Sequence, residues 1–507
     1  MRARRRIPAA VLAVLAVGVL AASTSTPAAP AGAPTATPTP TPSPASAAAT
    51  ARTPDRSVTV LDSADPVARA VEASRTLFAS SPGVVVAPAG DAAAVRRAVA
   101  DSGRLRVPLL LVPASDGAVL DVVRTEVTRL AATWVAAVGS VRDSALPGML
   151  RVDATRQPAP PHVPARPAVA VVGDPGADAA GAATALAAGA VVVDLAGRDC
   201  DLTRSPQAVA ALTAHRGAPA VLLGAGFATA PSATWTVASA RSGFQLPGGG
   251  QRPLPGHRFV ALYGVPGVPV LGALGDQGID ASIRRVRSFA AQYAPLSREP
   301  VVPTLEIIAT VAAGAPGARH DYSNELDPGA LQPWVAAARR AGVEVILDLQ
   351  PGRADFPSQA KRYAGLLEQP NVGLALDPEW RLGPHQVPLR QIGSVSAAEV
   401  NRTSAWLADL VTAHHLPPKP FVLHQFRLSM LPDRGRIVQR PELTTVIHVD
   451  GQGGQPDKQA TWRAVHLGAP AGVGWGWKNF LHKDHPMLTP QQTMRDVRPT
   501  PDLVTYQ

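Results

Sequence analysis

Residues 371–380, NVGLALDPEW, decide the fold that we expect for the C-terminal half of this 507-residue chain. The apolar run 372–376 carries no charge, which is the pattern of a parallel strand buried on both faces. It ends directly in Asp377 and Glu379, which share one strand face with small glycine and alanine side chains. The stretch therefore predicts a barrel strand with small residues inside and two carboxylates at its C-terminal end.

Apolar runs and helical periods alternate outward from this stretch, across residues 257–507. We expect strands near 258–264, 301–309, 343–350, 371–377, 420–427, 443–449 and 472–477. We expect helices near 280–293, 328–341, 357–368, 397–415 and 458–467. About 250 residues of this alternation match the size of a (β/α)8 barrel. The eighth strand has no clear signal, and a doubly wound sheet is the alternative fold.

The expected strands end in polar side chains, which is where a barrel places its chemistry. Two carboxylates across a cleft suit glycoside hydrolysis, since one protonates the leaving oxygen and another serves as base or nucleophile. We assign Glu379 as proton donor, with Asp377 orienting it or raising its pKa. Asp348 or Asp450 would be the second carboxylate. The alternative role for these acids is to cap loops and pair with nearby arginines.

The substrate-binding candidates are the other polar and aromatic residues near the same strand ends. Trp380, Trp475, Trp477 and Tyr263 could stack on sugar rings. The alternative for the tryptophans is packing in the core or at the rim. Glu306 lies deeper and suits a core acid. No cofactor is expected. The full substrate-binding set is Tyr263, Gln350, Trp380, His424, Gln425, His448, Gln452, Trp475, Trp477 and Lys478.

Two other functions remain open for the barrel. One is a metal-dependent hydrolase in which His424, His448, Asp450 and Asp348 converge as ligands, although no HxH or HExxH spacing is present. The other is a barrel that binds wall glycan without catalysis. Sensitivity to a chelator separates metal chemistry from carboxylate chemistry.

Two resemblances concern the barrel. Asp377-Pro-Glu379 is similar to the D-x-E at the end of strand four in barrel chitinases and barrel-fold lysozymes, but Val372 and Ala375 stand where the longer chitinase pattern has two earlier acids. The stretch 263–507 also resembles an uncharacterised, glycoside-hydrolase-like barrel domain of high-GC Gram-positive exported proteins. The phrases that carry this resemblance are LDLQPGR (347–353), GLALDPEWR (373–381), FVLHQF (421–426) and GWKNF (476–480).

Residues 57–241 predict a repeated three-layer α/β domain with two units, about 57–145 and 146–241, because each unit alternates buried strands with Ala-rich helices. The sequences GDAA (90–93), VPLLLV (107–112) and AVG (137–139) make this domain similar to the type 2 cell-wall-binding repeat. That resemblance implies non-covalent attachment to an anionic wall polymer. The chain departs from it in having two units instead of three, and Gly139-Ser140 in place of a double glycine.

The first residues predict export. A basic start and an apolar run within residues 1–23 have the order of a secretory signal peptide, and the Pro/Thr/Ala-rich stretch 24–56 predicts an extended linker. Gly/Pro-rich residues 242–256 predict a second linker. We therefore expect a secreted or wall-associated protein with no stable membrane span after signal cleavage.

The overall charge of the chain is +10. Four of the positive charges belong to arginines inside the signal peptide, and no basic run follows. Nucleic acid is therefore not expected as a partner. The expected partner is cell-wall polysaccharide or an anionic wall polymer.

Overall fold

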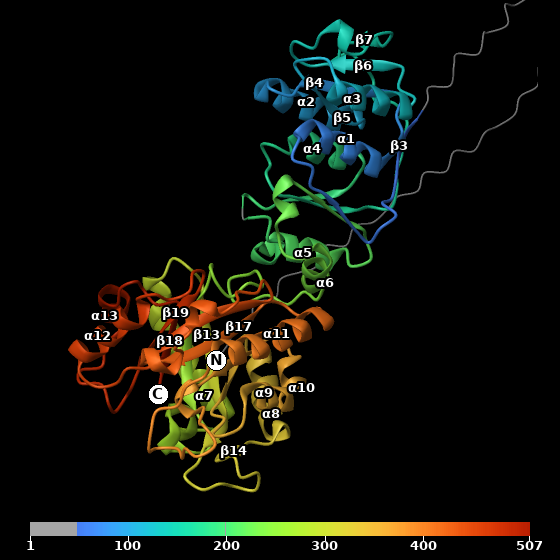
Figure 1. Cartoon of the computed structure of the whole chain (residues 1–507). Helices are drawn as coiled ribbons and strands as arrows, with labels where there is room; N and C mark the ends of the chain where they lie inside the picture. The colour runs from blue at the N-terminus through green and yellow to red at the C-terminus, as the bar shows by residue number, and fades with distance from the viewer. Residues whose placement is uncertain (1–47, 198) are drawn as a thin grey trace, which may run out of the picture. The chain divides into compact units, whose positions relative to one another are not determined.

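The structure is a computed structural model that describes residues 48–197 and 199–507 (Figure 1). The predicted signal peptide and most of the first predicted linker lie outside these residues. The predicted end of that linker is wrong, because Ala49–Ala51 form strand β1, in which Ala49 is fully buried. Strand β1 pairs with β3 (Phe78–Ser80) and β8 (His162–Val163).

Residues 258–506 form a closed barrel of eight parallel strands, within the part of the chain that the structure describes. Its closure is direct, because β12 pairs with both β13 and β20. Strand β14 (Ser323–Glu325) is antiparallel to β13 at its far end. The barrel strands are β12 (Arg258–Gly264), β13 (Val301–Ala312), β15 (Glu344–Leu349), β16 (Val372–Leu376), β17 (Lys419–Gln425), β18 (Leu443–Val449), β19 (Gly474–Asn479) and β20 (Leu503–Tyr506).

The seven expected strands are present, and the eighth is β20. Its four residues follow a proline-rich turn, so the segment is too short to show a pattern by itself. The doubly wound alternative is excluded by the β12–β20 pairing.

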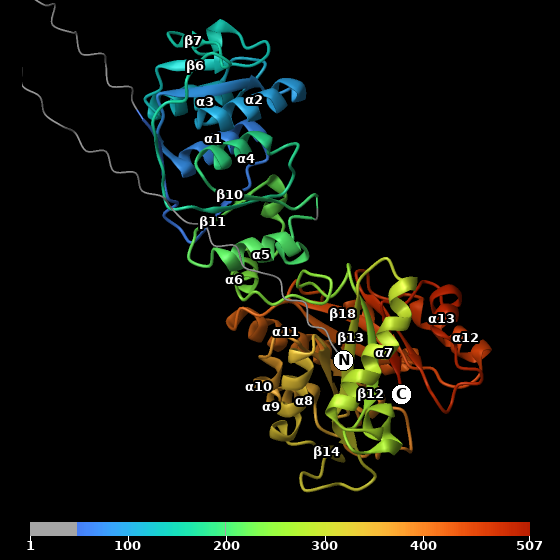
Figure 2. The same cartoon turned by 180° about the vertical axis from the view of Figure 1, so that it is seen from behind.

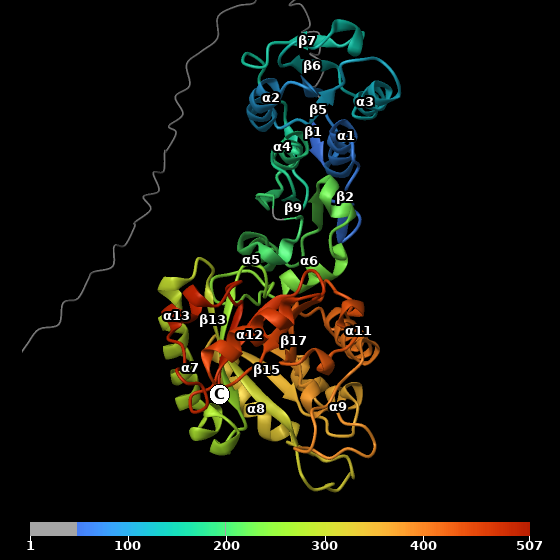
Figure 3. The same ribbon diagram turned by 60° about the vertical axis from the view of Figure 1, so that its left-hand side comes forward.

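Helices surround the barrel on its outer side (Figures 2 and 3). The predicted helix 357–368 is divided at Tyr363, whose hydroxyl donates to the carbonyl oxygens of Ala309 and Leu326 and so fixes the break against β13. The helices are α7 (Ile279–Tyr293), α8 (Pro328–Arg340), α9 (Phe356–Arg362), α10 (Ala364–Leu367), α11 (Ala397–Ala413), α12 (Gln455–His466) and α13 (Pro490–Asp496).

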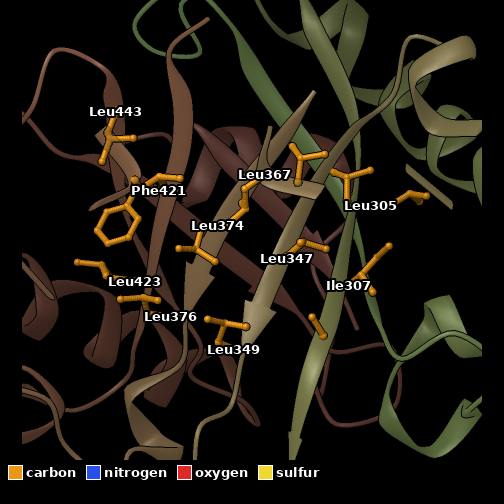
Figure 4. Close-up of a cluster of buried hydrophobic side chains, with 14 of the residues drawn as sticks. Leu305, Ile307, Leu347, Leu349, Leu367, Leu374, Leu376, Phe421, Leu423 and Leu443 are labelled. Carbon is orange, nitrogen blue, oxygen red and sulfur yellow. The ribbon is translucent and has the colours of Figure 1, made fainter. Parts of the chain in front are cut away.

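The main core lies between the strands and these helices. Figure 4 shows its leucine-rich part, in which Leu347, Leu374 and Leu423 extend from the outer faces of β15, β16 and β17. Because strand side chains alternate, the neighbouring residues Asp348, Ala375 and His424 face the barrel interior. The outer face thus supplies the apolar packing, and the inner face is free to carry charge.

The predicted linker 242–256 is packed instead of loose. Leu246 belongs to the apolar cluster that fills the N-terminal end of the barrel interior, together with Phe259, Ile346 and Val422. The Gln251 side chain is fully buried and donates to the carbonyl oxygens of Ser239 and Phe244. Gly/Pro composition therefore marks a tightly folded turn here.

The N-terminal α/β region contains two four-stranded parallel sheets. One has the order β5-β4-β6-β7 and the other β10-β9-β11-β2. The predicted division between units is crossed, because β2 (Val58–Leu61) pairs with β11 (Ala220–Leu223). The other strands are β4 (Gly83–Pro88), β5 (Leu109–Val112), β6 (Trp134–Ala137), β7 (Leu150–Val152), β9 (Val169–Val172) and β10 (Val191–Asp194).

Six helices accompany these sheets within the described residues. They are α1 (Pro66–Leu77), α2 (Ala92–Leu105), α3 (Ala118–Arg129), α4 (Ala179–Ala187), α5 (Pro206–Ala214) and α6 (Ala233–Arg241). Asp178 precedes α4 and forms a buried ion pair with Arg69 at 2.7 Å. Within residues 48–197 and 199–507, none of the helices has the length and apolar character needed to cross a bilayer.

Replacing Asp91 by alanine is expected to loosen the start of α2. Its carboxylate accepts from the backbone nitrogens of Ala93 and Ala94 at 3.0 and 2.9 Å, so the substitution leaves two amide hydrogens unpaired. The expected loss of helix stability is about 1 kcal/mol. Where hydrogen exchange follows the opening equilibrium of α2, this loss raises the exchange rate of α2 peptides about fivefold. Asp101→Ala, later in the same helix, is the matched control and should leave the exchange rate unchanged.

Candidate active site

The C-terminal half of the barrel interior is lined by charged and polar side chains. They lie on, or directly after, all eight of its strands. The same alternation that turns the leucines outward turns these side chains inward. Most are completely shielded from solvent. The set is Tyr263, Glu306, Asp348, Asp377, His424, His448, Asp450, Lys478 and Thr505.

Asp450 follows strand β18 and stands at the centre of this charged layer. Its Oδ2 lies 2.7 Å from His424 Nδ1 and 3.4 Å from Lys478 Nζ, and its Oδ1 lies 3.0 Å from His448 Nδ1. Burial by itself would raise the pKa of this carboxyl. The three basic groups outweigh that effect and hold the pKa of Asp450 well below its usual range.

Asp348 at the end of β15 has a different environment. Its Oδ2 accepts a hydrogen bond of 2.8 Å from the Tyr263 hydroxyl, and its Oδ1 lies 3.7 Å from His424 Nε2. Burial raises the pKa of Asp348, because His424 only partly offsets the loss of solvation. A fully buried acid with a raised pKa is less suited than Asp450 to meet a substrate.

Glu379 lies on the short turn Pro378–Trp380 that follows β16, and it is only partly buried. Burial and the negative charge of Asp450 raise the pKa of Glu379 to about 7. Asp377 is 5% exposed, and burial together with the charge of Glu379 raises its pKa well above the usual range. This arrangement can keep a proton on Glu379 at neutral pH.

The nearby arginines do not neutralise these acids. Arg381 pairs with Glu399 at 2.9 Å, and Arg353 lies over the ring of Tyr322 and donates to the carbonyl oxygen of Gln386. Arg427 lies over the ring of Phe426. Asp377 does cap the turn that follows it, since its carboxylate accepts from the Glu379 nitrogen at 3.4 Å. The capping part of the alternative is therefore present at Asp377, and the pairing with these arginines is not.

Comparison with known proteins adds little to this geometry. No family model matches the chain, and no curated protein sequence matches it. A search of solved structures finds a crystal structure of a xylanase–α-amylase inhibitor protein in complex with trehalose. The two chains are 13% identical, with a TM-score of 0.31, over 49% of this chain and 92% of that one. A likeness of this size carries no argument about function.

The structure separates two of the predicted sugar-stacking residues from the barrel interior. Trp477 is 1% exposed and belongs to the outer core, where its ring contacts Trp462 of α12. Trp475 lies on the same face and stacks on His466. Lys478 has the opposite parity and points inward, so the sugar contacts predicted for these two tryptophans are wrong.

Tyr263 does lie inside the barrel, but its ring face is covered. Lys478 Nζ lies 3.6 Å from the centroid of that ring, which leaves the hydroxyl toward Asp348 as its useful group. Gln350 Nε2 approaches the same hydroxyl at 3.5 Å. Both residues therefore position Asp348, and stacking of Tyr263 on a sugar is not supported.

The remaining predicted residues differ in their surroundings. Gln425 is fully buried and accepts from Arg434 Nη1 at 2.8 Å, so it holds a loop in place. Gln452 is exposed, and Trp380 is partly exposed beside Glu379. Of the predicted aromatic residues, Trp380 is the one placed to meet a ligand near Glu379.

Thr505 is a member of the layer that the sequence analysis did not name, and Glu306 is one that it named only as a deeper core acid. Glu306 Oε1 lies 3.0 Å from His424 Nε2, and Thr505 Oγ1 donates to Glu306 Oε2 at 3.0 Å. Strand parity could have identified Glu306, which shares a face of β13 with Thr304 and Ile308. Glu306, His424 and His448 each place one potential metal ligand within 4.8 Å of the others.

Proposed function

We propose that this protein is an exported cell-envelope glycoside hydrolase whose barrel cleaves wall or extracellular polysaccharide. The observation that carries the proposal is Glu379, a partly exposed carboxyl after β16 with its pKa raised to about 7. Such a group can hold a proton at neutral pH and deliver it to the oxygen of a breaking glycosidic bond.

Asp450 is the proposed second carboxylate. It ends β18, two strands along from the strand that carries Glu379, and its side chain is 12% exposed while that of Asp348 is fully covered. Its negative charge is the largest charge effect that raises the pKa of Glu379. Asp450 would assist attack at the anomeric carbon as a base or a nucleophile while Glu379 protonates the leaving oxygen.

The loop that follows Glu379 in the sequence borders a surface cavity, although Glu379 and Asp450 are not among its lining residues. A cavity of about 430 Å³ is bordered by residues 381–386, which directly follow the catalytic turn, and by 394–396. The Arg381–Glu399 ion pair supports this wall. A hollow lined by loop backbone and polar side chains suits a sugar chain that extends away from Glu379.

The N-terminal region would attach the enzyme to the wall. We propose that its two parallel sheets are related wall-binding units, a proposal supported by the GDAA and VPLLLV phrases around β4 and β5. Export would follow from the signal-like residues 1–23. Sedimentation of the protein with purified walls tests attachment, and release of reducing ends from wall polysaccharide tests hydrolysis.

The activity is expected to fall as the pH rises through about 7. The donor works in its protonated form, so the fraction of active enzyme declines above the pKa of Glu379, which is about 7. The charged groups around it are Asp450 on β18, Lys478 on β19, His424 on β17 and Asp348 on β15.

The measurement is kcat/KM for reducing-end release between about pH 4 and 9. A fall in kcat/KM on the alkaline side, with its midpoint near pH 7, agrees with the assignment. A limb near 4.5, the ordinary pKa of a glutamate, contradicts it.

A further inference from the structure

Four buried acceptor atoms meet in the barrel interior without any hydrogen-bond partner. They are Glu306 Oε1, Asp348 Oδ1, His424 Nε2 and His448 Nε2. All four residues are 0% exposed. Polar atoms removed from water cost free energy unless they are paired, so this cluster requires an explanation that the proposed glycan chemistry does not supply.

The hydrogen bonds at the other ends of these side chains orient the free atoms. Asp450 Oδ2 forms a hydrogen bond of 2.7 Å with His424 Nδ1, whereas its Oδ1 lies 3.0 Å from His448 Nδ1 without completing one. With its Nδ1–H directed at Asp450, neutral His424 presents a lone pair at Nε2. Thr505 donates to Glu306 Oε2 and leaves Oε1 free in the same way.

This is the arrangement of a metal ligand set with its supporting shell. Histidines that bind metals usually donate their other ring N–H to a carboxylate, which fixes the tautomer and the ring direction. Here Asp450 has that position for His424, and its other oxygen lies 3.0 Å from His448 Nδ1. The backbone makes room as well, because a Cβ at Gly476 would lie 2.2 Å from His448 Cδ2.

The distances agree with one ion between the ligands. His424 Nε2 and Glu306 Oε1 are 3.0 Å apart, and one potential ligand atom from each of Glu306, His424 and His448 lies within 4.8 Å of the others. Two atoms that bind the same zinc ion at about 2.1 Å are roughly 3.0–3.4 Å apart. A proton on His424 or a metal ion between the two atoms would each stabilise this contact.

We propose that Glu306, His424 and His448 form a binding site for a divalent transition-metal ion, held in orientation by Asp450 and Thr505. Two imidazoles and one carboxylate are ligands that suit Zn²⁺ or Mn²⁺ better than Ca²⁺ or Mg²⁺. The three ligands are different residues from the proton donor Glu379, but the site shares Asp450, the proposed second carboxylate of the hydrolase. It goes beyond the proposed function and does not depend on glycan cleavage.

The test is metal binding by the purified protein. The chain is stripped with a chelator, titrated separately with Zn²⁺ and Mn²⁺, and its bound metal is measured by elemental analysis after gel filtration, with thermal unfolding alongside. We expect about one tightly bound ion per chain and a higher unfolding temperature when it is bound. No stoichiometric binding of either ion would overturn the proposal.

Two variants locate the ion. His448→Gln removes a ligand and should weaken binding more than about 100-fold, while Thr505→Val removes only an orienting hydrogen bond and should weaken it about 10-fold. The second variant keeps the side-chain shape and is expected to fold. The control is His414→Gln/His415→Gln, an exposed pair on the surface, which should bind as the wild type does. Unchanged binding by folded Thr505→Val and His448→Gln proteins would refute the assignment.

Discussion

Replacing Glu379 by glutamine is expected to lower the rate of glycan cleavage by about 10²–10⁴-fold. Glutamine keeps the size and hydrogen-bonding shape of the side chain but has no proton to give to the leaving oxygen. Because Glu379 lies on a surface turn and pairs with none of the arginines around it, the variant should fold normally. The loss should appear in kcat, with KM for the polysaccharide little changed.

Glu368→Gln is the matched control for this experiment. Glu368 precedes β16, at the opposite end of the same strand, and its partner in the structure is His414 at 3.7 Å. The control should retain wild-type activity. Equal rates in wild type and a folded Glu379→Gln protein would move the chemistry away from Glu379, to Asp348, Asp450 or a metal ion.

Removing Asp484 should give the largest loss of stability among the substitutions considered. Its Oδ2 accepts from Lys458 Nζ at 2.7 Å and from the Phe480 nitrogen at 2.9 Å, and its Oδ1 accepts from the Gly453 nitrogen at 3.1 Å. The side chains of the ion pair are 1% and 0% exposed. Asp484→Ala strands the Lys458 charge inside the protein, which costs about 3–5 kcal/mol.

Chemical denaturation monitored by circular dichroism measures this loss. The double variant Asp484→Leu/Lys458→Met is expected to recover much of it, because two apolar side chains leave no buried charge. Asp457→Ala, an exposed change one residue from Lys458, is the control and should shift stability by less than about 0.5 kcal/mol. A loss of stability below about 1 kcal/mol for Asp484→Ala would show that breaking this buried ion pair does not destabilise the fold as its geometry indicates.

The barrel could be predicted from the sequence because its strands are uninterrupted apolar runs. Val372–Leu376 shows the pattern clearly and is followed by Asp377. In β17 the apolar run is shorter, Phe421–Leu423, and it is followed by His424 and Gln425 within the same strand. Strand β20 could not be found in this way. It is four residues long, and its place in the barrel is fixed by pairing with two other strands. Strand β12 lies far from it in the sequence, and a long connection separates it from β19.

The candidate site was predictable one strand at a time, but not its contacts. Parity identifies His448 with Asp450. It does not extend from Asp377 to Glu379, because the chain leaves the strand and forms the turn Pro378–Trp380. The approach of Asp450 to His424 depends on the register in which β17 and β18 pair. That register cannot be read from either strand alone. At β19 the prediction selected both Trp477 and Lys478. Consecutive strand residues face opposite sides, so a strict use of parity would have kept Lys478 and rejected Trp477.

The boundaries of the N-terminal region could not be found from composition. Residues 49–51 have the alanine and threonine content of the preceding linker, yet they form a strand because β3 and β8 flank them. Residues 58–61 likewise join β11, more than a hundred positions later. Long-range pairing decides both cases, and local sequence carries little information about it.

The most direct test of the account is release of new reducing ends from purified bacterial wall polysaccharides by the wild-type protein, with the Glu379→Gln protein in parallel. We predict that the wild type releases reducing ends from at least one wall fraction and that the folded variant stays at the level of the buffer blank. No release by the wild type from any fraction would contradict the account, and the barrel would then be a glycan-binding module.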